Sequence, residues 1–186
     1  GDLVAQRRRP MVFIHASDMA SLSRFEFNQR QFDLLCSDLS QLPISVATAS
    51  SDALPLILSP ISMTNYAGHC GYVAPAVLQE EKATTWGRQR ANELRSYLDP
   101  KKRPYIHLLD GGLSDNIGMR AVLENTAYVG DLESTFQSLG AKKIRKLVYL
   151  MVSAETTPDP NQYTFNEIPG LTRVSRALID IPINRY

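Results

Sequence analysis

The chain has 186 residues, which is enough for one ordinary domain with a buried core. Its hydrophobic content of 44% and charged content of 21% are close to globular averages, which excludes disorder of the whole chain. The 20 basic and 19 acidic residues give a net charge of +1, so nothing supports a nucleic-acid partner. No apolar run approaches the roughly 18 residues needed to span a bilayer. We expect a single domain over residues 1–186.

The first half of the chain predicts two strands and two helical segments. An arginine run at 7–9 is interpreted as a solvated approach to a buried strand at 11–17, and an alternating segment at 24–28 predicts a second strand. Apolar residues at helical spacing predict an amphipathic helix over 31–42. The small residues from Pro43 to Ala53, in a segment closed by Pro55, predict a helix or turn that packs closely against another element.

The second half of the chain also predicts strands and helices in turn. The pattern predicts strands over 61–66 and 105–109, and an exposed polar loop over 79–85. One-sided apolar spacing predicts a helix over 86–98, and cap candidates at its start predict a further helix over 115–127.

The segment 146–154 is the strongest strand pattern in the chain. Strands that alternate with helical segments predict an α/β fold with a largely parallel sheet. We see no internal repeat and no boundary between domains.

The segment "YIHLLDGGLSDN" concentrates the polar chemistry of the chain. Asp110 directly follows a predicted strand, and in α/β sheets ligands gather at the carboxyl ends of strands. Gly111 and Gly112 would let the backbone turn sharply and let a partner approach. Asp110 is therefore a turn residue, a catalytic residue, or, together with Asp115, a ligand of Mg²⁺ or Ca²⁺.

The chain offers few candidates for a nucleophile. It contains no G-x-S-x-G elbow, and Ser50 and Ser51 lie in "ATASSDALP" with no flanking glycine, as cap or packing serines do. The histidines at His15, His69 and His107 are too scattered for a metal centre, and His107 is expected in the core. A Ser-His-Asp triad would need the absent elbow.

The only two cysteines, Cys36 and Cys70, form no C-x-x-C or His/Cys cluster, which argues against a zinc site. They could pair in an oxidising compartment or remain as free buried thiols. Spacing along the chain does not decide between these alternatives.

Three segments together resemble the patatin-like phospholipase family. "ISVATASSDALPLILSPI" is similar to the family's Ala-Ser segment with its later prolines, and "LLDGGLSDNIGMRAVLE" resembles its Asp-Gly-Gly/Ala motif. "FIHASDMASLSRFEFN" resembles the strand, Ser/Thr-Asp loop and second strand of the family. Order and spacing agree over most of residues 10–125.

The resemblance implies a three-layer α/β/α domain and a Ser-Asp dyad that cleaves acyl esters without a metal or an organic cofactor. Asp110 corresponds to the aspartate of the dyad, the general base, and Gly111 and Gly112 would border the substrate. The implied substrates are phospholipids or other acyl-ester lipids, reached at a peripheral membrane surface.

The family's serine elbow and oxyanion loop precede these segments, and no room for them exists in residues 1–10. We therefore expect the chain to be the C-terminal portion of a patatin-like catalytic domain, inactive alone, with an N-terminal segment of the parent protein as its partner. A sheet that lacks its first strands should expose an edge and an apolar face. The alternatives are a non-catalytic binding module of the same fold and a Mg²⁺-dependent phosphatase-like site at Asp110 and Asp115.

Overall fold

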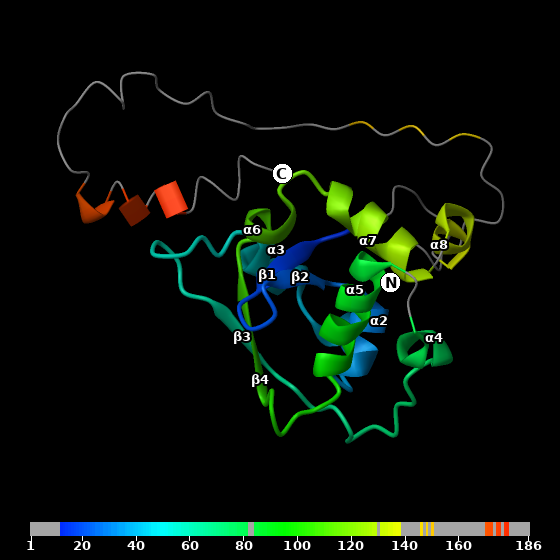
Figure 1. Ribbon diagram of the computed structural model, residues 1–186. Helices are drawn as coiled ribbons and strands as arrows, with labels where there is room; N and C mark the ends of the chain where they lie inside the picture. The colour runs from blue at the N-terminus through cyan, green and yellow to red at the C-terminus, as the bar shows by residue number, and fades with distance from the viewer. Residues whose placement is uncertain are drawn as a thin grey trace.

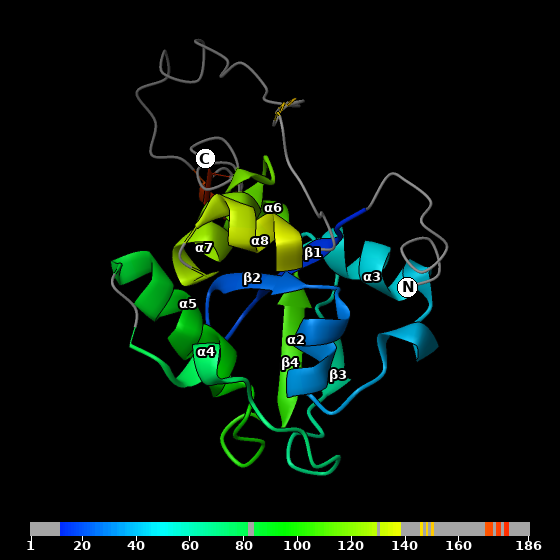
Figure 2. The ribbon, with the colours of Figure 1, turned by 90° about the vertical axis from the view of Figure 1, so that its right-hand side faces the viewer.

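The computed structural model describes residues 12–81, 84–129 and 131–138, together with the single positions 146, 148, 150, 170–172, 174, 175, 177 and 178. Figures 1 and 2 show the arrangement of its elements in two views. The strands are β1 (His15–Asp18), β2 (Ser23–Glu26), β3 (Ile61–Thr64) and β4 (Tyr105–Leu109). The helices are α2 (Gln29–Leu34), the 3-10 turn η1 (Leu39–Gln41), α3 (Ile44–Ser51), α4 (Ala76–Gln79), α5 (Thr85–Ser96), α6 (Gly112–Asp115), α7 (Met119–Val129) and α8 (Leu132–Ser138).

The four strands form one sheet in the order β2-β1-β4-β3. Each neighbouring pair is antiparallel, with Ala16 opposite Phe25, Ser17 opposite Leu109, and Met63 opposite Ile106. The chain is therefore a mixed α/β protein, but the predicted largely parallel sheet is wrong. Only four residues separate β1 from β2, and a parallel pair needs a crossover of a dozen or more.

Most elements lie where the sequence predicts them, with shifted ends. The first strand begins at His15 rather than at residue 11, and the helix predicted over 86–98 is α5, capped by the Thr84 hydroxyl on the Gly87 N–H. The helix predicted over 115–127 is α7, which begins four residues later, and the short helix α6 precedes it. The run at 7–9 and the strand predicted over 146–154 lie outside the described residues, except for three single positions.

One face of the sheet carries the apolar core. Ala16, Phe25, Ile106 and Leu108 point to this face and are fully buried against α2, whose Phe32 stacks edge-on against Phe25. These residues alternate along their strands, as expected for strands with two different faces. Tyr97, just after α5, closes the same cluster.

On the other face of the sheet, α6 packs on β1 and β2, and Arg24 of β2 pairs with Glu124 of α7, whereas no described helix covers the side chains of β4 and β3 that point there. Tyr105 and His107 are exposed there beside Ser62 and Thr64, and the His107 Nδ1 lies 2.7 Å from the Ser62 hydroxyl. The prediction that His107 belongs to the core is wrong, because alternation along β4 points it away from Ile106 and Leu108. The open part of the face is polar rather than apolar, contrary to expectation.

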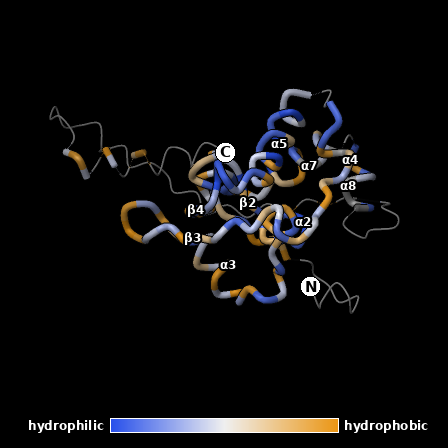
Figure 3. Tube along the Cα trace, turned by 90° about the horizontal axis from the view of Figure 1, so that it is seen from below, coloured by the Kyte–Doolittle hydropathy of each residue, from blue (hydrophilic) through white to orange (hydrophobic). Residues whose placement is uncertain are grey.

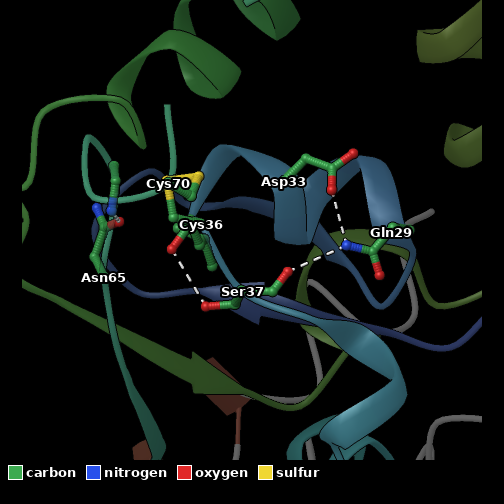
Figure 4. The surroundings of a disulfide bond; sticks show 8 residues. Gln29, Asp33, Cys36, Ser37, Asn65 and Cys70 are labelled. Carbon is green, nitrogen blue, oxygen red and sulfur yellow. Dashed lines mark hydrogen bonds between the residues drawn. A yellow bond between two sulfur atoms is a disulfide. The ribbon is translucent and has the colours of Figure 1, made fainter. Parts of the chain in front are cut away.

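Cys36 and Cys70 form a disulfide, which decides between the alternatives that the sequence left open. Their Cα atoms lie 5.4 Å apart, and the bond ties the end of α2 to the loop after β3 (Figure 4). The nearby Asn65 amide donates to the backbone carbonyl oxygens of Tyr97 and Arg103, so several connections at this end of the sheet are held together. A structural disulfide is typical of proteins that fold in an oxidising compartment.

Candidate functional site

Asp110 follows the last residue of β4, at a turn held by backbone bonds from two directions. Its N–H donates to the carbonyl oxygen of Ala53, and the N–H of Gly111 donates to that of Ser51, at 2.9 and 3.0 Å. From β1, the Ser17 hydroxyl donates to the carbonyl oxygen of Asp110 at 2.7 Å. The end of α3 and the middle of β1 therefore fix the backbone of Asp110 in space.

Among the described residues, only one of the two carboxylate oxygens of Asp110 accepts a hydrogen bond. Its Oδ1 accepts the Gly112 N–H at 2.7 Å, while Oδ2 has no hydrogen-bond partner among the described residues. Partial burial raises the pKa of Asp110; the Gly112 bond opposes this shift, the negative charge of Asp52 adds to it, and His15 opposes it. A carboxylate with a raised pKa and one uncommitted oxygen is a better proton acceptor than an ordinary surface aspartate.

Gly111 is required by close packing rather than by an unusual backbone angle. Its φ and ψ of −62° and −31° are ordinary helical values. A Cβ at this position would lie 2.6 Å from the backbone oxygen of His15 and 3.2 Å from the Ser51 Oγ. At Gly112, a Cβ would lie 3.0 Å from the Asp110 Oδ1. Both glycines therefore keep the surroundings of Asp110 free of side chains, and their predicted contact with substrate stays a prediction.

His15 connects β1 to α6 beside this turn. Its Nε2 lies 2.9 Å from the backbone carbonyl oxygen of Asp115. Since a carbonyl oxygen can only accept, Nε2 is the donor in this bond. The Cδ2 edge of the ring faces Gly111, at 3.1 Å from the position of the missing Cβ. The ring of His15, the first residue of β1, therefore forms one wall of the turn.

An open hollow of about 380 Å³ lies against this wall, between the start of β1 and the end of α3. The residues that line it are Phe13, Ile14, His15, Thr48, Ser51 and Asp52. Asp110 is not among them, but the two side chains whose charges act on its pKa are. A second hollow of about 260 Å³ lies between α4 and α5, away from this site.

The two candidate serines differ in their surroundings. Ser50 is fully buried, and its hydroxyl donates to the carbonyl oxygen of Val46 one helical turn earlier, as the packing interpretation predicts. Ser51 lines the hollow, and its Oγ points toward Gly111. Of the two, only Ser51 has a hydroxyl near the turn of Asp110.

Asp115 serves the structure and not a metal. Its carboxylate accepts the N–H groups of Arg120 and Ala121 and so caps the start of α7, while Arg24 lies 3.7 Å away. Arg24 is itself buried and paired with Glu124 at 2.9 Å. With Asp115 engaged in this way, the reading of Asp110 and Asp115 as a pair of metal ligands has no support. Within the described part of the chain, no cluster of three or more His, Cys, Asp or Glu side chains could hold a metal ion.

The sequence singled out Asp110 but missed the residues that position it. Ser17 lies on β1, and its hydroxyl oxygen is also 2.8 Å from that of Ser114. Ser17 is buried beneath α6, and a serine in a short strand carries no sequence signal for that role. The small residues of α3 predicted that this segment packs closely against another element, but not that Asp110 is its partner, because the bonds that join them are between backbone groups.

Among the described residues, no helix is both long and apolar enough to cross a membrane. Comparison of the chain with protein-family models, with curated proteins and with solved structures finds no match. The likeness to patatin-like phospholipases therefore rests on the three sequence segments alone, and the function assigned to the site is a proposal.

Proposed function

We propose that this chain carries the base of a Ser-Asp acyl-ester hydrolase of the patatin-like kind, with Asp110 as the base. The observation that carries the proposal is the Oδ2 of Asp110, which has no hydrogen-bond partner in the described part of the chain, on a carboxylate whose backbone is fixed and whose pKa burial raises. The ordered sequence segments around Ser51, Asp110 and Asp18 support the family assignment. The nucleophilic serine comes from a G-x-S-x-G that these 186 residues do not contain.

The reaction has two stages, acylation of the serine and hydrolysis of the acyl-serine. Asp110 Oδ2 takes the proton of the serine hydroxyl as its oxygen forms a bond to the ester carbonyl carbon. The same proton passes to the leaving alcohol oxygen as the carbon–oxygen bond of the ester breaks, which leaves an acyl-serine. Asp110 then takes a proton from water as the water oxygen bonds to the acyl carbon, and it passes that proton to the serine oxygen as the acyl–serine bond breaks, which releases the fatty acid, the free serine and the ionised Asp110.

The substrate class is a phospholipid or another acyl-ester lipid, presented at a membrane surface. No group in the described residues calls for a metal in this reaction, because Asp110 acts on the serine directly. A base of this kind contributes about 10²- to 10⁴-fold to the rate.

The test uses this chain and the longer protein that joins it to a G-x-S-x-G segment. A fluorophosphonate probe should label the serine of that segment in the longer protein and no serine of this chain alone. In the longer protein, Asp110→Asn should lower kcat for a short-chain ester by about 10²-fold or more while the unfolding midpoint does not fall. Labelling of Ser51 in the isolated chain would place the nucleophile at the hollow and overturn the assignment.

Asp52→Asn is the matched control, because Asp52 is an exposed carboxylate whose charge raises the pKa of Asp110. Its removal should leave kcat at high pH nearly unchanged and move the acid limb of the pH profile to lower pH. If Asp110→Asn and Asp52→Asn have equal effects, neither is the base.

The absence of a G-x-S-x-G in the chain favours one alternative, a non-catalytic binding module of the same fold. If the chain is a binding module, the longer protein should neither react with the probe nor hydrolyse esters. The Asp110→Asn variant should then bind the partner of the module as strongly as the unmodified protein does. The same two measurements therefore separate the two functions.

A further inference from the structure

The loop of residues 54–60, "LPLILSP", stands directly beside Asp110. At its start, Ala53 accepts the N–H of Asp110. At its end, Ile61 pairs with Leu108 on β4, two residues before Asp110. Both ends of the loop are thus fixed to the strand end that carries the proposed base, while its middle projects from the body of the protein between α3 and β3 (Figure 1).

The projecting part of the loop is apolar and exposed. Leu56, Ile57 and Leu58 have exposed fractions of 78%, 73% and 48%. Figure 3 shows this outer part in the colour of hydrophobic residues. Leu56 has a φ of +70°, a conformation that leucine rarely adopts, so local preference does not account for the shape of the loop. Three adjacent exposed aliphatic side chains at one tip indicate a contact surface.

Most backbone N–H groups of the loop are either bonded within the chain or absent. The Leu54 N–H donates to Asp52, and the N–H groups of Ile57 and Leu58 both donate to the carbonyl oxygen of Leu54. Pro55 and Pro60 have no N–H at all. Five of the seven positions in 54–60 therefore present no free backbone donor, which suits contact with lipid, where an unpaired polar group is costly.

The charge of the surrounding chain indicates the kind of lipid. Residues 39–79 include one acidic residue, Asp52, and no lysine or arginine. Anionic membranes are bound through clusters of basic residues, and this segment has none. The tip itself offers few hydrogen bonds to a protein partner, because the only polar side chain in 54–60 is Ser59.

We propose that the 54–60 loop inserts Leu56, Ile57 and Leu58 into the surface of an electrically neutral, zwitterionic lipid bilayer. The insertion holds the carboxyl end of β4, and with it Asp110, against the lipid. The choice of lipid as the occupant rests on the proposed function, but the insertion itself requires no catalysis.

The experiment measures co-sedimentation of the 186-residue chain with phosphatidylcholine vesicles. The variant Leu56→Asn/Ile57→Ser should bind at least about tenfold more weakly, because each exposed aliphatic side chain that enters lipid contributes appreciably to binding. Asparagine is chosen because it tolerates a positive φ. The matched control is Val73→Ser, which removes an 83% exposed apolar side chain from the loop after β3. Val73→Ser should bind as the unmodified chain does.

Each other result contradicts the proposal in its own way. Equal binding by the loop variant places the contact elsewhere, and binding only to vesicles with phosphatidylserine shows an anionic surface. Absence of vesicle binding together with concentration-dependent dimers in sedimentation velocity shows that a second copy covers the loop. If the loop variant fails to fold, Ile57→Trp in a Trp86→Phe background decides: its emission should shift to the blue with phosphatidylcholine vesicles, and an unchanged emission refutes insertion. Loss of catalysis by Asp110→Asn in the longer protein tests the proposed function separately.

Discussion

Replacement of Gly111 by alanine tests the packing that fixes Asp110. The new Cβ would lie 2.6 Å from the backbone oxygen of His15, which is shorter than any ordinary contact and involves an atom that cannot turn aside. Such overpacking costs about 1–3 kcal/mol. The backbone of Gly111 is helical, so alanine also recovers roughly 0.5–1 kcal/mol of conformational entropy. We expect a net loss of about 1–2 kcal/mol in the free energy of unfolding.

For a chain of this length, that loss corresponds to a fall of about 2–8 °C in the unfolding midpoint. The assay is thermal unfolding followed by circular dichroism, with urea denaturation for the free energy. Gly112→Ala is the matched control, since its new Cβ would meet only side-chain oxygens, of Asn116 and Asp110, at 3.0 Å. It should change stability by less than about 0.5 kcal/mol. A Gly111→Ala protein as stable as the unmodified one would show that β1 does not approach the turn as described.

Three further predictions concern the disulfide, the cap of α7 and the titration of the base. Replacing Cys36 and Cys70 by serine should lower the free energy of unfolding by about 4 kcal/mol, which is the loop entropy expected for a sequence separation of 34. Urea denaturation with and without reductant measures this loss. An unmodified chain whose stability does not change with reductant would contradict the disulfide. Asp115→Ala leaves Arg24 buried with one partner fewer and removes the cap of α7, and should cost about 3 kcal/mol in urea denaturation, whereas a loss below about 1 kcal/mol would refute its structural role. Burial raises the pKa of Asp110 in the folded state, so the folded protein holds this proton more tightly than the unfolded chain does. The free energy of unfolding therefore falls as the pH rises through the folded-state pKa of Asp110. Asp110→Asn should therefore be more stable than the unmodified chain at pH 7, with the difference vanishing at pH values below the ordinary aspartate range; a destabilised variant at pH 7 would contradict the raised pKa.

The positions of the elements could largely be predicted from the sequence. The alternation in "YIHLL" and the helical spacing in 86–98 are local signals, and both predicted elements are present as β4 and α5. Such signals are readable because side chains alternate between the two faces of a strand and recur on one face of a helix about every 3.6 residues. The sequence also singled out Asp110 between a strand and paired glycines. These features depend on neighbours within a few positions in the chain.

Only the tertiary structure decided how the strands pair and what surrounds Asp110. The antiparallel pairing of β1 with β4 joins residues about ninety positions apart in the chain. The hydrogen bonds that fix Asp110 to Ser17 and to Ala53 also join residues that are far apart in the sequence. Backbone donors and acceptors are identical in every residue type, so no residue pattern reveals them. The pairing of Cys36 with Cys70 depended likewise on the distance between their Cα atoms. The sequence alone identified the candidate base, and long-range packing determined its geometry and its charge.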